Sequence, residues 1–139
     1  MKSTEILVNE IKSTYNIAQF ISDNQEDIYD PDLCKYIHKL MKEKNLNKAQ
    51  IMRDGLLNQN YAYQILAGRK NPSRDKVIQL CFGLRLNLED AQRLMSLADV
   101  GALYPRNKRD AVVMYGLEHK KRLIDVNIIL EELKEYPFE

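Results

Sequence analysis

The stretch NLNKAQIMRDGLLNQNYAYQILAGRKNPS, residues 45–73, decides the fold of this chain. Its apolar residues recur at helical spacing, Gly55 interrupts the first run, and Asn58 has the side chain of a helix N-cap. Gly68 is suited to end the second run. The stretch predicts two short helices joined by a tight turn, a helix-turn-helix. The apolar residues of the first part are Leu46, Ile51, Met52 and Leu57, and the inward residues predicted for the second helix are Ala62 and Ile65.

A basic turn follows the second predicted helix. Arg69 and Lys70 lead into Asn71 and Pro72, which favour a turn and fix the direction of the chain. Ser73 comes directly afterwards, and its hydroxyl is suited to cap the next helix.

This pattern resembles the DNA-binding domain of the phage-repressor-like family, often called the Xre family. The resemblance covers residues 32–97 without a gap, and it is carried by the apolar Leu46 and Ile51 and by the turn residues Gly68, Asn71, Pro72 and Ser73. It implies an all-α fold, in which a five-helix repressor-like helix-turn-helix domain has an added N-terminal helix and C-terminal helices. It also implies sequence-specific binding of double-stranded DNA.

The chain departs from the usual family pattern at three places. Lys48 stands where the family usually has Gln, and Leu56 stands where it usually has the turn Gly. Met52 replaces a small residue and Ala62 replaces a β-branched one, so large and small residues are exchanged across one helix contact. Such an exchange can conserve packed volume, and we therefore expect the fold to be preserved.

Length and composition set limits on the rest of the chain. It has 139 residues, of which 45% are hydrophobic, enough for one domain with a sizeable core and an appendage. Pro and Gly are scarce and β-branched runs are short, so we expect helices only. Two cysteines and the absence of an apolar leader in residues 1–12 indicate the cytoplasm. No stretch is long and apolar enough for a membrane span, so no membrane partner is expected.

Three segments are expected along the chain. Residues 1–31 form an amphipathic helix and an acidic linker, residues 32–98 form the helix-turn-helix DNA-binding domain, and residues 99–139 form a C-terminal helical extension. The extension has more apolar surface than short helices can bury alone, so it should pack on the N-terminal helix, on the domain or on a second copy of the chain. We also expect a homodimer, because many repressors of the resembling type bind two DNA half-sites as dimers. The helices expected outside the domain cover residues 4–22, 109–117 and 123–134.

The net charge of +1 conceals an uneven distribution of charge. Residues 1–31 contain two Lys and six acidic residues, a net charge of −4. Residues 32–76 contain ten Lys and Arg and four acidic residues, a net charge of +6, while residues 77–139 have a net charge of −1. Positive charge thus coincides with the helix-turn-helix, as binding to nucleic acid requires.

Base reading is assigned to the start of the second motif helix, around Asn58–Leu66, because this end of the helix enters the major groove. The outward side chains there are Gln59, Asn60, Tyr63 and Gln64. Amide side chains can bind adenine at N6 and N7, whereas Lys and Arg favour guanine. The helix contains no cation, so we expect a preference for sites that contain A·T pairs.

Phosphate contacts are expected from residues next to the base-reading side chains, at the start of the first motif helix and on the turn after the second. The interpretation of Tyr61 leaves two alternatives, phosphate contact or partial burial against the neighbouring helix. A second basic cluster, Arg106, Lys108 and Arg109, would either bind flanking DNA or pair with the acidic N-terminal segment. The candidate phosphate-binding residues are Asn47, Lys48, Tyr61, Arg69, Lys70, Asn71 and Arg74.

Other chemistry finds little support in the sequence. Cys34 and His38 are four residues apart on one helix, but a zinc site needs two more ligands, so no metal and no cofactor is expected. Gly-rich phosphate loops, nucleophile elbows and paired catalytic carboxylates are missing from the sequence, and an enzyme is therefore not expected.

The expected function is that of a transcriptional regulator of bacterial or phage type. The alternative is a protein-interaction module on a helix-turn-helix scaffold, of antitoxin or anti-defence type, with a protein partner bound through the N- or C-terminal helices. The basic motif segment favours DNA, and the aromatic recognition helix without cations favours the alternative. A small-molecule sensor ranks third, because the extra helices are short.

Overall fold

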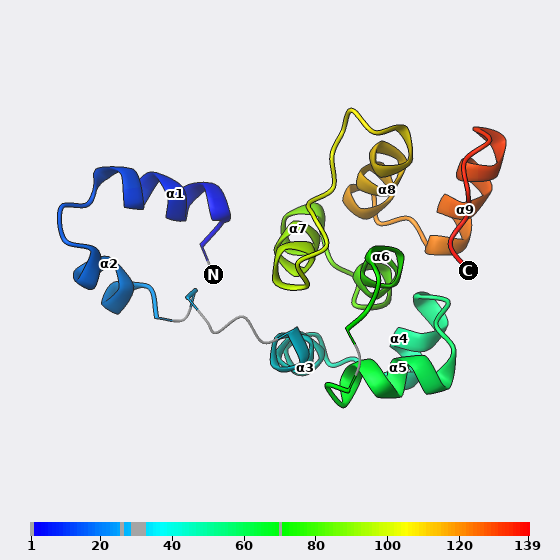
Figure 1. Ribbon diagram of the computed structural model, residues 1–139, viewed down its shortest axis with the longest axis horizontal. Helices are drawn as coiled ribbons and strands as arrows, with labels where there is room; N and C mark the ends of the chain where they lie inside the picture. Colours follow the sequence, from blue (N-terminus) through cyan, green and yellow to red (C-terminus); the bar gives the residue numbers. More distant parts are fainter. Residues whose placement is uncertain (1, 26, 29–32, 70) are drawn as a thin grey trace. The chain divides into compact units, whose positions relative to one another are not determined.

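The computed structural model describes residues 2–25, 27–28, 33–69 and 71–139. These residues form helices and connecting loops and contain no strand, which confirms the all-α prediction (Figure 1). None of the described helices combines the length and the apolar character that crossing a bilayer requires. The chain divides into two compact units, residues 1–31 and residues 32–139.

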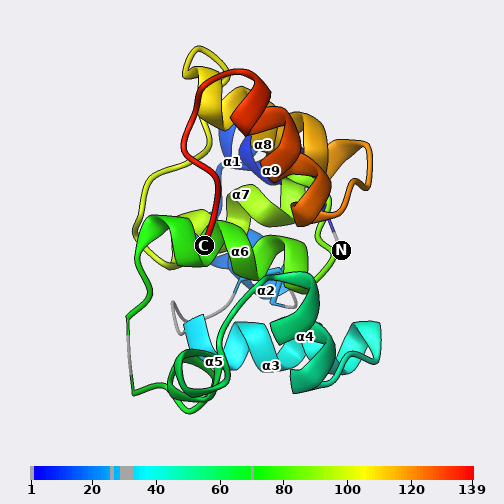
Figure 2. The ribbon, with the colours of Figure 1, turned by 90° about the vertical axis from the view of Figure 1, so that its right-hand side faces the viewer.

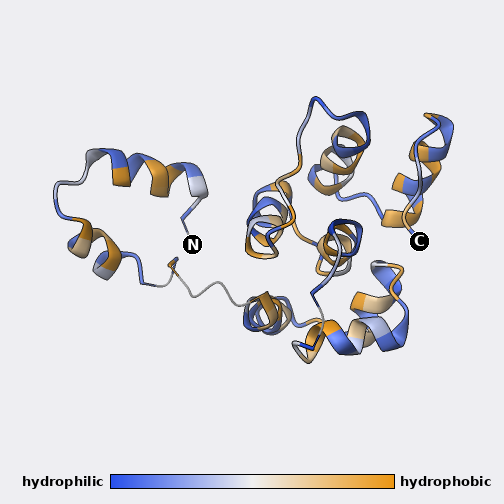
Figure 3. Cartoon of the chain, viewed as in Figure 1, coloured by the Kyte–Doolittle hydropathy of each residue, from blue (hydrophilic) through white to orange (hydrophobic). Residues whose placement is uncertain are grey.

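The first unit contains two short helices, α1 (Thr4–Ser13) and α2 (Ile17–Asp23), so the prediction of one continuous helix over residues 4–22 was wrong. The helix breaks because polar side chains bind the local backbone. The Thr14 hydroxyl accepts a hydrogen bond from the Asn16 N–H at 3.2 Å, and the Asn16 side chain caps α2. Within the described residues α1 buries no side chain, and apolar residues of both helices are exposed. Figure 3 marks the apolar positions along these helices in orange.

The second unit contains seven helices among its described residues, arranged around α6 (Figure 2). In α6 every residue from Val77 to Gly83 is buried. Helices α4, α7 and α8 contact α6 directly, so this helix forms the centre of the core. The helices are α3 (Leu33–Lys44), α4 (Lys48–Asp54), α5 (Gln59–Leu66), α6 (Arg74–Gly83), α7 (Leu88–Leu97), α8 (Lys108–Glu118) and α9 (Leu123–Glu132).

Side-chain caps fix where most of these helices begin. Each cap accepts a hydrogen bond from a backbone N–H of the first turn, which would otherwise lack an intrahelical partner. The caps that the sequence predicted at Asn58 and Ser73 are confirmed. The capping residues of α4 to α8 are Asn47, Asn58, Ser73, Asn87 and Asn107.

Helices α8 and α9 extend the core of the second unit. Val113 and Leu117 of α8 and Val126 and Leu130 of α9 are buried, and α8 contacts both α6 and α7. After α9 the chain turns back, and Phe138 is buried. Of the packing alternatives for the C-terminal extension, the structure therefore shows packing on the domain itself.

Candidate nucleic-acid interface

The backbones of α4 and α6 approach each other closely at two glycines. A Cβ atom on Gly83 would lie 2.7 Å from the carbonyl oxygen of Ile51. A Cβ atom on Gly55 would lie 2.7 Å from the carbonyl oxygen of Gln79. Since real Cβ atoms do not come this close, both positions require glycine, and they fix α4 on the central helix.

The turn between α4 and α5 has different backbone requirements at Gly55 and at Leu56. Leu56 adopts a left-handed conformation with φ of 54°, which a glycine would adopt at lower cost, whereas Gly55 has φ of −92°. Glycine at position 55 is required by the approach of α6 and not by its own dihedral angles. In this turn the left-handed position is occupied by a leucine, and the glycine stands one residue before it.

Gln79 of α6 holds this turn in place. Its side chain is only 1% exposed, and its Nε2 donates to the carbonyl oxygens of Gly55 and Leu56 at 3.0 and 3.2 Å. The same nitrogen lies 2.8 Å from the Glu139 main-chain oxygen. Sequence reasoning missed Gln79, and the only signal for it was a lone amide inside the apolar run VIQLCF.

Helix α5 is anchored at both ends. The Asn58 side chain accepts a hydrogen bond from the Tyr61 N–H at 2.8 Å. At the other end, the carbonyl oxygen of Leu66 lies 3.1 Å from Cys34 Sγ and 2.7 Å from His38 Nε2. Because a carbonyl oxygen can only accept, both α3 side chains act as donors. Cys34 and His38, which the sequence analysis considered as metal ligands, thus bind the last carbonyl group of α5.

All four predicted base-reading side chains lie on the exposed face of α5. Gln59 Nε2 donates to the Tyr63 hydroxyl at 3.2 Å, which orders two of them one helical turn apart. Lys48 Nζ of α4 lies 5.3 Å from the centre of the Tyr63 ring, within the range of a cation–π contact. Asn60 and Gln64 form no side-chain hydrogen bond with any residue that the structure describes.

The predicted phosphate-binding residues fall into different environments. The Asn47 side chain caps α4 in a capping box with Gln50, and Tyr61 is half-buried, with Lys76 Nζ 5.6 Å from its ring centre. Arg69 and Asn71 are exposed on the turn after α5, and their side chains form no hydrogen bond or ion pair with described residues. Lys70 lies outside the described residues.

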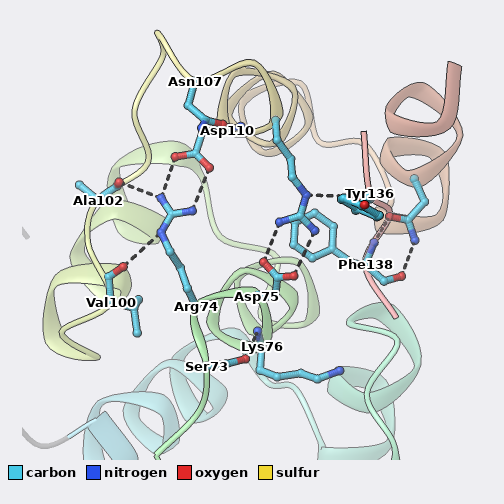
Figure 4. Close-up of polar contacts among 12 residues, drawn as sticks. Ser73, Arg74, Asp75, Lys76, Val100, Ala102, Asn107, Asp110, Tyr136 and Phe138 are labelled. Carbon is cyan, nitrogen blue, oxygen red and sulfur yellow. Dashed lines mark hydrogen bonds and ion pairs between the residues drawn. The ribbon is translucent and has the colours of Figure 1, made fainter. Parts of the chain in front are cut away.

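Arg74 has a structural role that the sequence did not predict. Its Nη1 and Nη2 donate to the two Asp110 carboxylate oxygens at 2.9 and 2.7 Å (Figure 4). Its Nε and Nη2 also donate to the carbonyl oxygens of Val100 and Ala102. The guanidinium is therefore occupied inside the protein, which argues against the predicted phosphate contact. No local signal could reveal this, because Asp110 is 36 residues away.

Burial and hydrogen bonding act in opposite directions on Asp110. Burial alone would raise the pKa of this carboxyl group, but the hydrogen bonds from Arg74 and from the Tyr104 N–H, together with the charge of Arg74, hold its pKa below the ordinary value. Asp110 is thus charged in the folded protein, and the bidentate pair joins α6 to the start of α8.

Two residues of the second basic cluster, Lys108 and Arg109, bind other residues of the second unit, and neither pairs with a described residue of the acidic N-terminal segment as one alternative had predicted. Arg109 donates to both carboxylate oxygens of Asp75 at 2.7 and 3.1 Å, and its guanidinium lies 4.0 Å from the Phe138 ring centre (Figure 4). Lys108 Nζ donates to the Leu133 carbonyl oxygen. These partners belong to α6 and to the C-terminal segment, not to the acidic N-terminal segment.

Comparisons of this chain with protein-family models, with curated proteins and with solved structures found no match. A function for the chain is therefore inferred from its own residues and their geometry.

Proposed function

We propose that residues 32–98 form a repressor-like helix-turn-helix domain that binds double-stranded DNA, with α5 in the major groove. The observation that carries the proposal is the exposed face of α5, on which Gln59, Asn60, Tyr63 and Gln64 lie together while both ends of the helix are anchored. A base-reading helix needs such fixed placement, because hydrogen bonds to base edges tolerate little displacement.

The distribution of charge supports the same surface. Residues 32–76, which include α4 and α5, have a net charge of +6. Lys48, at the start of α4, and Arg69, after α5, are both exposed. In the sequence they stand before and after the base-reading residues. Cations that flank a polar helix can bind phosphates and hold that helix in register on the duplex.

The side chains of α5 also indicate which bases are read. Three of the four base-reading residues are amides, which suit adenine, and the Tyr63 ring can contact a thymine methyl group. The operator therefore contains A·T pairs at the positions that α5 contacts. The protein acts as a transcriptional regulator, and as a homodimer it binds two half-sites about one helical turn apart.

The competing function is a protein-interaction module. It is favoured by one observation: α5 has no cation and exposes 42% of Tyr63, as a protein-binding surface would. The basic charge of the surrounding segment favours DNA over this alternative.

The deciding experiment is a selection from random-sequence duplex DNA with the purified full chain, followed by binding of the selected sequence across a salt series. We expect an A·T-containing, two-fold symmetric motif and an affinity that falls steeply with salt. If selection enriches no motif, and binding is weak and lost at moderate salt, the DNA proposal is wrong and protein partners should be tested.

A further inference from the structure

A surface groove of about 940 Å³ lies in the second unit, and no residue of α5 lines it. Its walls come from the ends of α3 and α4, the connection between α6 and α7, and the connection between α8 and α9. The apolar residues along it include Leu56, Phe82, Leu86, Leu117, Leu123 and Ile124. Two of these expose a large part of their surface, Leu56 with 36% and Ile124 with 52%.

Cationic side chains line the groove on both walls. Six lining residues are basic and two, Asp54 and Glu118, are acidic, so the lining has a net charge of +4. The basic residues are Lys44, Arg53 and Arg85 on one wall and Lys120, Lys121 and Arg122 on the other.

Part of this positive charge has no counterpart within the protein. Asp54 pairs with both Arg53 and Arg85, at 3.3 and 3.0 Å. Lys120 and Lys121 are exposed and form no ion pair with any residue that the structure describes. Arg122 pairs with Asp125 at 3.0 Å, so Lys120 and Lys121 are the cations that the wall between α8 and α9 presents to an external anion.

None of the proposed base-reading or phosphate-binding residues lines the groove. Arg53 and Asp54 end α4, whereas Lys48, which contacts the Tyr63 ring, begins it. The positive charge at the groove is thus not explained by phosphate contacts next to α5.

We propose that this groove binds an acidic amphipathic α-helix of a partner protein. Such a helix would place an apolar stripe on Leu56 and Ile124 and direct carboxylates toward the cations on both walls. A helix is about 10–12 Å wide, and an amphipathic helix in an apolar groove is a recurrent mode of recognition. Nucleic acid would satisfy the cations but would leave the apolar residues exposed to water.

The test measures, by isothermal titration calorimetry, the binding of a synthetic peptide to the full chain. The probe is a capped peptide of about 16 residues with Leu along one helical face, Glu on both flanks and Ala elsewhere. One control peptide replaces each Glu by Lys, and the other replaces each Leu by Gln. We expect the probe to bind and both control peptides not to bind. The affinity for the probe should fall about fivefold or more between about 0.1 M and about 1 M salt, because salt screens the attraction between its carboxylates and the cations of the groove.

Matched protein variants locate the binding surface. Ile124 and Ile128 both lie on α9 and are 52% and 53% exposed, but only Ile124 lines the groove. Ile124→Ser should weaken probe binding about tenfold, and Ile128→Ser should change it by less than about twofold. Lys120 and Lys134 form a second matched pair, because both are exposed and both have a positive φ. Only Lys120 lines the groove, so Lys120→Glu should weaken probe binding and Lys134→Glu should leave it unchanged.

Three outcomes would overturn the proposal: no saturable binding of the probe, equally tight binding of the Lys peptide, or equal losses from Ile124→Ser and Ile128→Ser. Binding of a single-stranded oligonucleotide that Lys120→Glu abolishes, with no binding of the probe, would identify nucleic acid as the occupant and would also overturn it. Because no DNA duplex is present, these results are independent of whether α5 reads DNA.

Discussion

The side-chain nitrogen of Gln79 lies 3.0 Å from the carbonyl oxygen of Gly55, so one buried amide of α6 joins the core to the turn that precedes α5. The Gly55 oxygen belongs to the end of α4, where carbonyl groups lack intrahelical donors. Gln79 therefore supplies the turn with hydrogen bonds that α4 and α5 do not provide.

Gln79→Leu should destabilise the fold by about 1–3 kcal/mol, because the Gly55 and Leu56 carbonyl oxygens lose their donor in a buried environment. Denaturant unfolding measures this loss. Binding to the selected operator should weaken as well, at a temperature where the variant is folded. Gln92→Leu is the matched control, since Gln92 exchanges two hydrogen bonds with the Leu103 backbone far from the turn. A similar loss of operator affinity in both variants would contradict the specific role of Gln79.

Gln59→Ala should reduce operator affinity by about 1–3 kcal/mol and leave affinity for random DNA nearly unchanged, because an amide that reads a base carries sequence information. Arg69→Ala should weaken binding to both DNAs alike and reduce the salt slope by about one, because a phosphate contact does not depend on sequence. Titrations over a salt series test both results. The control is Gln19→Ala, an exposed amide on α2. If Gln59→Ala and Arg69→Ala change the affinities for the operator and for random DNA in the same way, the assignment of Gln59 to base reading and of Arg69 to phosphate binding is wrong.

Arg74→Met should destabilise the fold by about 2–4 kcal/mol, because it leaves the buried Asp110 carboxylate without its cation. Thermal or denaturant unfolding measures this effect. The salt slope of DNA binding should match that of the parent protein when measured well below the melting temperature. A reduced slope would show that Arg74 contacts phosphate after all.

Stability should fall at acid pH through Asp110 and Asp54. For Asp54, burial would raise the pKa, but hydrogen bonds and charges from Arg85 and Arg53 hold it below the ordinary value, as Arg74 does for Asp110. A carboxyl whose pKa is lower in the folded state stabilises the fold above its unfolded pKa of about 3.9, and this contribution is lost as the pH falls through the folded pKa. Urea unfolding at a series of pH values below about 5 measures the loss. Asp110→Asn should make this pH dependence shallower, and an unchanged dependence would contradict the assignment.

Leu56→Gly should stabilise the fold by up to about 1 kcal/mol, because relief of the left-handed conformation outweighs the added flexibility of the unfolded chain. Gly55→Ala should destabilise it, because the new Cβ would lie 2.7 Å from the Gln79 carbonyl oxygen. Chemical denaturation of both variants decides between these signs. A stabilising Gly55→Ala would show that α4 and α6 can separate at low cost.

Features encoded by neighbouring residues could be predicted from the sequence. The caps at Asn58 and Ser73 depend on contacts within a single turn, and so does the end of α5 near Gly68, where φ is 73°. The all-helical character follows from composition and periodicity. The exposed face of α5 follows from the same periodicity, because its inward residues Ala62 and Ile65 are buried.

Of the features that sequence reasoning missed, one depends on residues far apart in the chain and another on a local hydrogen bond. Arg74 has the composition of a phosphate ligand, and only the packing of α8 on α6 brings Asp110 to it. The break between α1 and α2 arises from a balance between helix periodicity and the Thr14–Asn16 hydrogen bond, which the periodicity alone does not reveal.

The glycine contacts between α4 and α6 limit where the domain can adjust its shape. At these two glycines the backbones lie close together with no Cβ atom between them, so we expect α4 and the central helix to move together. Any adaptation of α5 to a curved or irregular ligand must then occur in residues 55–58, by changes in backbone dihedral angles. Residues 55–58, and not the packing of α4, therefore limit how far α5 can shift to fit ligands of different shape.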